Sequence, residues 1–145
     1  MNTAIGPLPP LIVFDRVTKR YGDKAVLEQL SFVIARNDFV VLTGPAGTGK
    51  TTVIRLIAAL ERPTSGTIIV AGEPLAEIRQ RALLHLRRSI GIVPQELTLL
   101  DDRSVLENVA LPVAAAGLSR GEARSRAAAA LHRVGLDDVD SGVLP

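Results

Sequence analysis

The chain has 145 residues, of which 47% are hydrophobic and 22% are charged. This balance is typical of one globular α/β domain and excludes a disordered chain. The formal net charge is only +2, and three Phe, one Tyr and no Trp leave little aromatic surface for stacking bases, so we expect no direct binding of nucleic acid. The absence of cysteine excludes disulfides, thiolate metal sites and a cysteine nucleophile.

Residues 1–10 are expected to form a flexible leader. They carry no basic residue and contain three prolines, so they predict neither a signal peptide nor a membrane anchor. The longest apolar stretch, residues 109–118, contains Pro112 and is far shorter than the roughly 20 residues that a membrane span needs. We therefore expect no membrane span within the chain and a reducing, cytoplasmic location.

Three short segments rich in β-branched residues predict an antiparallel sheet. Strands are expected at residues 11–15 and 30–35, with a turn at residues 21–23 between them. Residues 67–70, which lie between two glycines, predict a third strand of the same sheet. A short buried strand is also expected at residues 89–93.

Helices are expected in the regions with apolar side chains at helical spacing or with a capping box, in which a Ser and a Glu three residues later satisfy each other's backbone N–H groups. These are residues 52–60, residues 77–88, a helix opened by Ser104 and Glu107, and a helix opened by Ser119 and Glu122 that ends at Gly135.

Residues 44–52 read Gly-Pro-Ala-Gly-Thr-Gly-Lys-Thr-Thr and follow residues 39–43, whose composition predicts a strand. The segment fits G-x-x-x-x-G-K-[ST], the pattern of a phosphate-binding loop. Its glycines let successive N–H groups point at one anion, and the helix that follows adds its positive dipole end. Lys50 is expected to contact the β- and γ-phosphates, and the Thr51 hydroxyl to hold Mg²⁺. The predicted nucleotide-binding residues of the loop are Gly44, Pro45, Ala46, Gly47, Thr48, Gly49, Lys50, Thr51 and Thr52.

Together with two further residues, this loop resembles the ATP-binding subunit of ABC transporters. Tyr21 stands where that family has an aromatic residue that stacks on adenine, and Gln95 stands where it has the glutamine of its Q-loop. The resemblance covers residues 11–145. It implies an α/β fold of the P-loop NTPase class, with the N-terminal part of a parallel core sheet and a small antiparallel β-subdomain.

The resemblance also implies ligands and roles. ATP and Mg²⁺ are the implied cofactors, with Lys50 and Gln95 acting in catalysis and Thr51 and Gln95 contacting the metal. In the family, the segment after the Q-loop receives a membrane subunit, which corresponds here to residues 96–115. The implied site of action is the inner face of the cell membrane, and intact relatives act as ATPase dimers.

Within the family, residues 99–112 are most similar to the cell-division ATPases of the FtsE type. The lipoprotein-release and macrolide-export ATPases are similar as well. A chain of the FtsE type would act with an FtsX-like membrane protein.

The family's signature sequence, Walker B segment and switch histidine follow the regions matched here, and residues 141–145 lie about where the signature begins. We therefore expect nucleotide binding with negligible turnover, because hydrolysis needs a residue that positions water. Residues 39–42 should lack a neighbouring strand on at least one edge, which predicts a marginally stable or aggregation-prone chain. Two alternatives stay open: a non-catalytic fragment that binds nucleotide or a partner, and a small-molecule P-loop kinase, which the late position of the loop and Gln95 disfavour.

Overall fold

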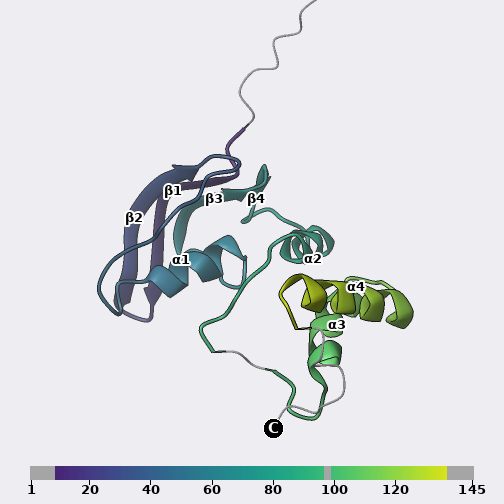
Figure 1. Cartoon of the computed structure of the whole chain (residues 1–145). Coiled ribbons are helices and arrows are strands. Elements are labelled where there is room, and N and C mark those ends of the chain that lie inside the picture. The colour runs from purple at the N-terminus through teal and green to yellow at the C-terminus, as the bar shows by residue number, and fades with distance from the viewer. Residues whose placement is uncertain (1–8, 97–98, 137–145) are drawn as a thin grey trace, which may run out of the picture. The chain divides into compact units, whose positions relative to one another are not determined.

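The computed structural model describes residues 9–96 and 99–136 (Figure 1). The chain divides into two compact units, Met1–Ile92 and Val93–Pro145. Most of the expected leader, two residues of the expected docking segment and residues 141–145 lie outside the described residues. In the part of the chain that the structure describes, no helix has the length and apolar character needed to cross a membrane.

The first unit is built on an antiparallel sheet with the strand order β2-β1-β3-β4. The strands are β1 (Ile12–Tyr21), β2 (Lys24–Ile34), β3 (Ser65–Val70) and β4 (Glu73–Pro74). The three expected strands, their antiparallel pairing and the turn after Tyr21 are confirmed. β1 and β2 are longer than the sequence pattern predicts.

Irregularities in the pairing of β1 and β2 explain this difference in length. Arg16 and Gln29 have positive φ angles of 48° and 46°, and the register shifts around them. The Arg16 N–H donates to the Ser31 hydroxyl at 2.8 Å, and the Gln29 N–H donates to the Thr18 hydroxyl at 3.1 Å. Side-chain hydroxyls thus accept from two backbone N–H groups at the irregular positions of the β1–β2 pairing. Because a bulge shifts the alternation of inward and outward residues, the sequence pattern breaks while the strand continues.

Helix α1 (Lys50–Ile57) lies against one face of this sheet (Figure 1). It begins and ends earlier than expected. Its C-terminal turn is closed by N–H bonds from Ala59 to Leu56 and from Leu60 to Arg55, with Ala59 in the left-handed conformation. This is a Schellman-type end, which stops the helix without glycine. The shared core of the unit comprises Phe14, Val17, Leu27, Val53, Leu56, Ile68, Val70, Leu75 and Leu86.

Helix α2 (Gln80–Arg88) contributes Leu86 to that core. It starts later than the expected residue 77, because the Glu77 N–H donates to the Pro74 carbonyl at 3.2 Å in a preceding turn. The Arg87 guanidinium donates to the Ala59 carbonyl at 2.5 Å and so ties α2 to the end of α1.

The predictions of strands at residues 39–43 and 89–93 are wrong, since neither range forms a strand. An extended segment becomes a strand only when a neighbour pairs with its backbone, and the described sheet consists of β1 to β4 alone. Phe39 is 93% exposed and Val41 67% exposed, and Val93 is also exposed, at 89%. Residues 39–42 thus lack a neighbouring strand in the described sheet, as expected, and their apolar side chains are exposed.

The second unit contains α3 (Val105–Ala115) and α4 (Arg120–Arg133). Both predicted capping boxes are confirmed, with Ser104 and Glu107 opening α3 and Ser119 and Glu122 opening α4. The helices pack on each other through Leu106, Ala127 and Leu131. Gly135 follows α4 with a positive φ of 77°, and its N–H donates to the His132 carbonyl at 3.0 Å, as expected for a C-terminal glycine.

The two capping carboxyl groups make helix stability depend on pH. The backbone N–H of Ser104 lowers the pKa of Glu107, and the Ser119 hydroxyl lowers the pKa of Glu122, from the ordinary value of 4.5. A lowered pKa stabilises the folded state above the unfolded value, and this stabilisation is lost as pH falls through the folded pKa. We expect circular dichroism to show a loss of helix below pH 4.5 that the double variant Glu107→Gln, Glu122→Gln largely lacks.

A matched control is the double variant Glu28→Gln, Glu77→Gln, which also removes two glutamate charges, but at positions outside the capping boxes. It should lose helix with acid as the unsubstituted chain does. If both double variants respond to acid alike, the capping carboxylates do not govern the transition.

Candidate functional site

The loop that follows the exposed segment 39–43 bends directly into α1, which begins at Lys50. The Lys50 ammonium group donates to the carbonyl of Gly44 at 2.8 Å and to that of Pro45 at 2.6 Å. The Thr48 hydroxyl also donates to the Pro45 carbonyl, at 2.9 Å. These bonds draw the start of the loop toward the first turn of the helix, so the loop is already curled around a positive charge.

The N-terminus of α1 is suited to an anion. Its N-cap residue, Gly49, makes no side-chain capping bond, and the first turn carries no acidic residue. The first N–H groups of a helix have no partner within the helix, and they lie at the positive end of its dipole. Residues 44–52 also contain no acidic side chain that would oppose a phosphate.

Close packing on β2 fixes the position of the loop. Gly49 has a φ of 89°, and a Cβ atom there would lie 2.8 Å from Leu27 Cδ2 and 3.1 Å from the Val26 carbonyl oxygen. A side chain at this position would push the loop off the strand. Leu27 pairs with Lys19, which lies about 7 Å from Tyr21 along β1, so Gly49 packs near the end of the sheet that carries Tyr21.

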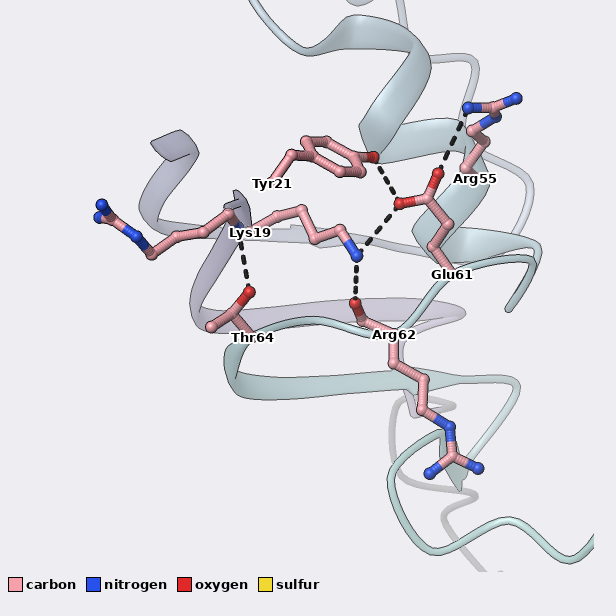
Figure 2. Close-up of polar contacts among 7 residues, drawn as sticks. Lys19, Tyr21, Arg55, Glu61, Arg62 and Thr64 are labelled. Carbon is pink, nitrogen blue, oxygen red and sulfur yellow. Dashed lines mark hydrogen bonds and ion pairs between the residues drawn. The ribbon is translucent and has the colours of Figure 1, made fainter. Parts of the chain in front are cut away.

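Tyr21 ends β1 and takes part in a polar cluster (Figure 2). Its hydroxyl donates to the Glu61 carboxylate, which also pairs with Lys19 at 3.1 Å and with Arg55 at 3.3 Å. The Tyr21 hydroxyl lowers the pKa of Glu61 most, and Lys19 and Arg55 lower it further, against the opposing effect of burial. The Lys19 ammonium group lies 4.9 Å from the centre of the Tyr21 ring and donates to the Arg62 carbonyl at 2.9 Å.

Sequence reasoning missed Lys19, Arg55 and Glu61. Glu61 lies 40 positions after Tyr21 in the chain, so no local spacing connects them. A charged residue just after the end of a helix is ordinarily solvated. The one signal in the sequence that could have pointed to a functional role for Glu61 is its position after a helix that starts at a phosphate-binding motif.

The first unit contains Tyr21 and the whole of residues 44–52. Thr51 is exposed on α1, as expected for a metal ligand, whereas Thr52 is buried at 8% exposure. Gln95 is exposed and belongs to the second unit. Its contact with the metal stays a prediction.

The residues of the loop fit a nucleotide-bound Mg²⁺ ion. Across residues 9–96 and 99–136 there is no group of three or more His, Asp or Glu residues that could hold a metal. Mg²⁺ does not need such a group, because it is usually held by one or two protein ligands together with phosphate oxygens and water. Thr51 is exposed, and its hydroxyl would be a ligand of that kind.

Comparison with known proteins gives a match to the family model described as ABC transporter over residues 27–144. The cell division ATP-binding protein FtsE of Escherichia coli K12 is 40% identical over 129 residues, which are 88% of this chain and 58% of FtsE. The methionine import ATP-binding protein MetN 1 of Rhodococcus jostii is 41% identical over 126 residues, which are 84% of this chain and 37% of MetN 1. The chain thus spans between a third and three fifths of the length of these relatives.

Two solved structures share the fold. The dimeric structure of MJ0796, a bacterial ABC transporter cassette, superposes with a TM-score of 0.79 at 30% identity, covering 89% of this chain and 60% of MJ0796. The dimer of MJ0796 in a post-hydrolysis state, bound to ADP and Pi, gives a TM-score of 0.77 at 27% identity over 92% of this chain and 63% of that one. The predicted fold class, a P-loop NTPase of the ABC ATPase type, is confirmed. Since the family model covers most of its residues, the chain belongs to the ABC transporter family.

Proposed function

We propose that the chain binds ATP, with residues 44–52 holding the phosphates and the Tyr21 ring holding the adenine, as the nucleotide-binding part of an ABC complex. The observation that carries this proposal is the loop itself. It curls around the Lys50 ammonium group and ends at a helix N-terminus that no side chain caps. Such an arrangement of N–H groups and one cation suits a polyphosphate.

Each residue of the site then has a chemical role. A lysine ammonium group has three donors, and Lys50 uses two of them on loop carbonyls, so one remains for a phosphate oxygen. The Thr51 hydroxyl would supply a ligand for Mg²⁺, and the ion would offset the negative charge of the phosphates. Stacking of adenine on Tyr21 would contribute about 1–3 kcal/mol, as base–aromatic stacking does elsewhere. Gln95 is proposed to contact the metal or the attacking water, since its amide both donates and accepts.

Calorimetric titration with ATP and Mg²⁺ tests the proposal. We expect saturable binding at one site per chain, and competition by inorganic tripolyphosphate, which carries the phosphates without the base. The secondary structure is checked by circular dichroism in the same samples. If the titration shows no saturable binding although circular dichroism shows intact secondary structure, the proposed site is ruled out.

The finer proposal concerns the complex in which the chain acts. We propose an FtsE-like role in cell division, with an FtsX-like membrane protein docking on residues 96–115 at the cytoplasmic face of the membrane. The similarity of residues 99–112 to FtsE-type ATPases supports this proposal. The sequence identities to FtsE and to MetN 1 are nearly equal, at 40% and 41%. A role in an importer or another ABC transporter is therefore the second candidate.

Co-purification from cells separates the two candidates. A tagged chain should retain an FtsX-like protein through detergent extraction and gel filtration if the role is in cell division. Recovery of a transporter permease in its place would favour the second candidate.

A further inference from the structure

The Tyr21 side chain is anchored at its hydroxyl by Glu61, which two cationic side chains hold in turn (Figure 2). Glu61 accepts from the Tyr21 hydroxyl, and its two carboxylate oxygens also meet the cations of Lys19 and Arg55. The Lys19 and Glu61 side chains are only 14% and 19% exposed, so this pair is partly shielded from water, whereas Arg55 is 57% exposed. Tyr21 as a whole residue is 45% exposed and so is available to a ligand.

The cluster and the phosphate loop are connected by one short helix. Lys50 begins α1, and Arg55 lies in its last turn. These residues are separated along the helix axis by about 8 Å. Tyr21 is bonded to Glu61, and Glu61 is paired with Arg55 in the last turn of α1. The positions of the Tyr21 ring and of Lys50 are therefore both tied to the same helix.

We propose that Glu61 is a positioning residue that holds the Tyr21 ring at the distance and tilt from the loop that an adenosine nucleotide requires. An exposed tyrosine at a strand end has two side-chain torsions to fix, and a bond at the far end of the ring fixes both of them. Glu61 therefore governs the preference for an adenosine nucleotide over a bare polyphosphate. This inference rests on the proposed binding of ATP.

The competing explanation is that Glu61 only stabilises the segment that connects α1 to β3. In that case its removal would loosen the loop as well, and every ligand of the loop would lose affinity. A positioning role predicts a loss confined to ligands that carry a base.

Affinities for two probes, ATP with Mg²⁺ and inorganic tripolyphosphate with Mg²⁺, distinguish these explanations. We expect Glu61→Ala to weaken ATP binding about three- to tenfold and to leave tripolyphosphate binding unchanged. Glu77→Ala, which removes a carboxylate elsewhere in the first unit, should change neither affinity. Equal losses for both probes in Glu61→Ala would overturn the proposal. If neither probe binds the unsubstituted chain, the proposed function fails first.

Tyr21→Phe provides an independent test because it keeps the ring and removes only the hydroxyl. It should weaken ATP binding as much as Glu61→Ala does, and the double variant should be no weaker than either single variant. Additive losses in the double variant would show that Glu61 acts by a route other than Tyr21.

Fluorescence reports on the anchor itself. The chain contains one tyrosine and no tryptophan, so its aromatic emission on excitation of tyrosine comes from Tyr21. A carboxylate bonded to a tyrosine hydroxyl quenches that emission by accepting the excited-state proton. We expect Glu61→Gln to be brighter than the unsubstituted chain and Glu77→Gln to be unchanged. Equal emission from all three proteins would contradict the bond on which the proposal depends.

Discussion

Replacement of Lys50 by methionine is expected to weaken the binding of ATP with Mg²⁺ by about a hundredfold. Methionine keeps the length and apolar stem of lysine and removes the ammonium group. A hydrogen bond to a charged group contributes about 1.5–3 kcal/mol, and 1.4 kcal/mol corresponds to a factor of ten. The ammonium group also closes the loop through Gly44 and Pro45, so its loss relaxes the loop as well. Calorimetric titration measures the change.

Arg81→Met is the matched control for this experiment. Arg81 is exposed on α2, outside the loop, and its replacement by methionine also removes one positive charge. ATP affinity should stay within about twofold, because salt screens an exposed charge that is not part of the proposed site. A loss in Arg81→Met as large as that in Lys50→Met would mean that net charge, and not the loop, determines binding.

Gly66→Ala is expected to have the largest effect on stability. Gly66 lies in β3 with a φ of 85°, and a Cβ atom there would lie 2.3 Å from the Arg16 carbonyl oxygen and 2.6 Å from Val17 Cα. These neighbours are backbone atoms of β1 and cannot move aside as a flexible side chain would. Left-handed backbone and the forced overlap together should cost about 3–4 kcal/mol in the free energy of unfolding. Urea denaturation followed by circular dichroism measures this loss.

Gly72→Ala separates backbone strain from overlap. Gly72 has nearly the same φ, 87°, but no atom lies within 4 Å of the Cβ position. Only the cost of the left-handed conformation remains, which is about 1 kcal/mol. If the two variants lose equal stability, contact between β3 and the bulge at Arg16 is not what makes glycine necessary at position 66.

Local signals in the sequence were sufficient wherever a few neighbouring residues determine the structure. Ser104 and Ser119 open α3 and α4 with the bonds that a Ser and a Glu three residues later predict. Residues 21–23 form the expected turn, and residues 44–52 form the expected bend into a helix. In each case the bonded partners lie within a few positions of one another.

Long-range partners set the features that the sequence did not predict. Residues 39–43 have the composition of a strand, but composition does not supply the neighbour that a strand needs. The anchoring of Tyr21 by Glu61 depends on where the end of α1 meets β1, which only the folded chain determines. The proposed phosphate-binding residues are thus readable as a motif, whereas the residues that we propose to orient the Tyr21 ring are not.

The bonds from Lys50 to two main-chain carbonyls hold its ammonium group in place, so a nucleotide bound as proposed would add a phosphate oxygen at the third donor. The bonds to the neutral carbonyls join a charge to two dipoles, whereas the bond to a phosphate would join two full charges. Added salt screens full charges far more than it screens adjacent dipoles. Raising the ionic strength should therefore weaken the proposed binding of nucleotide, while the bonds from Lys50 to the loop carbonyls persist.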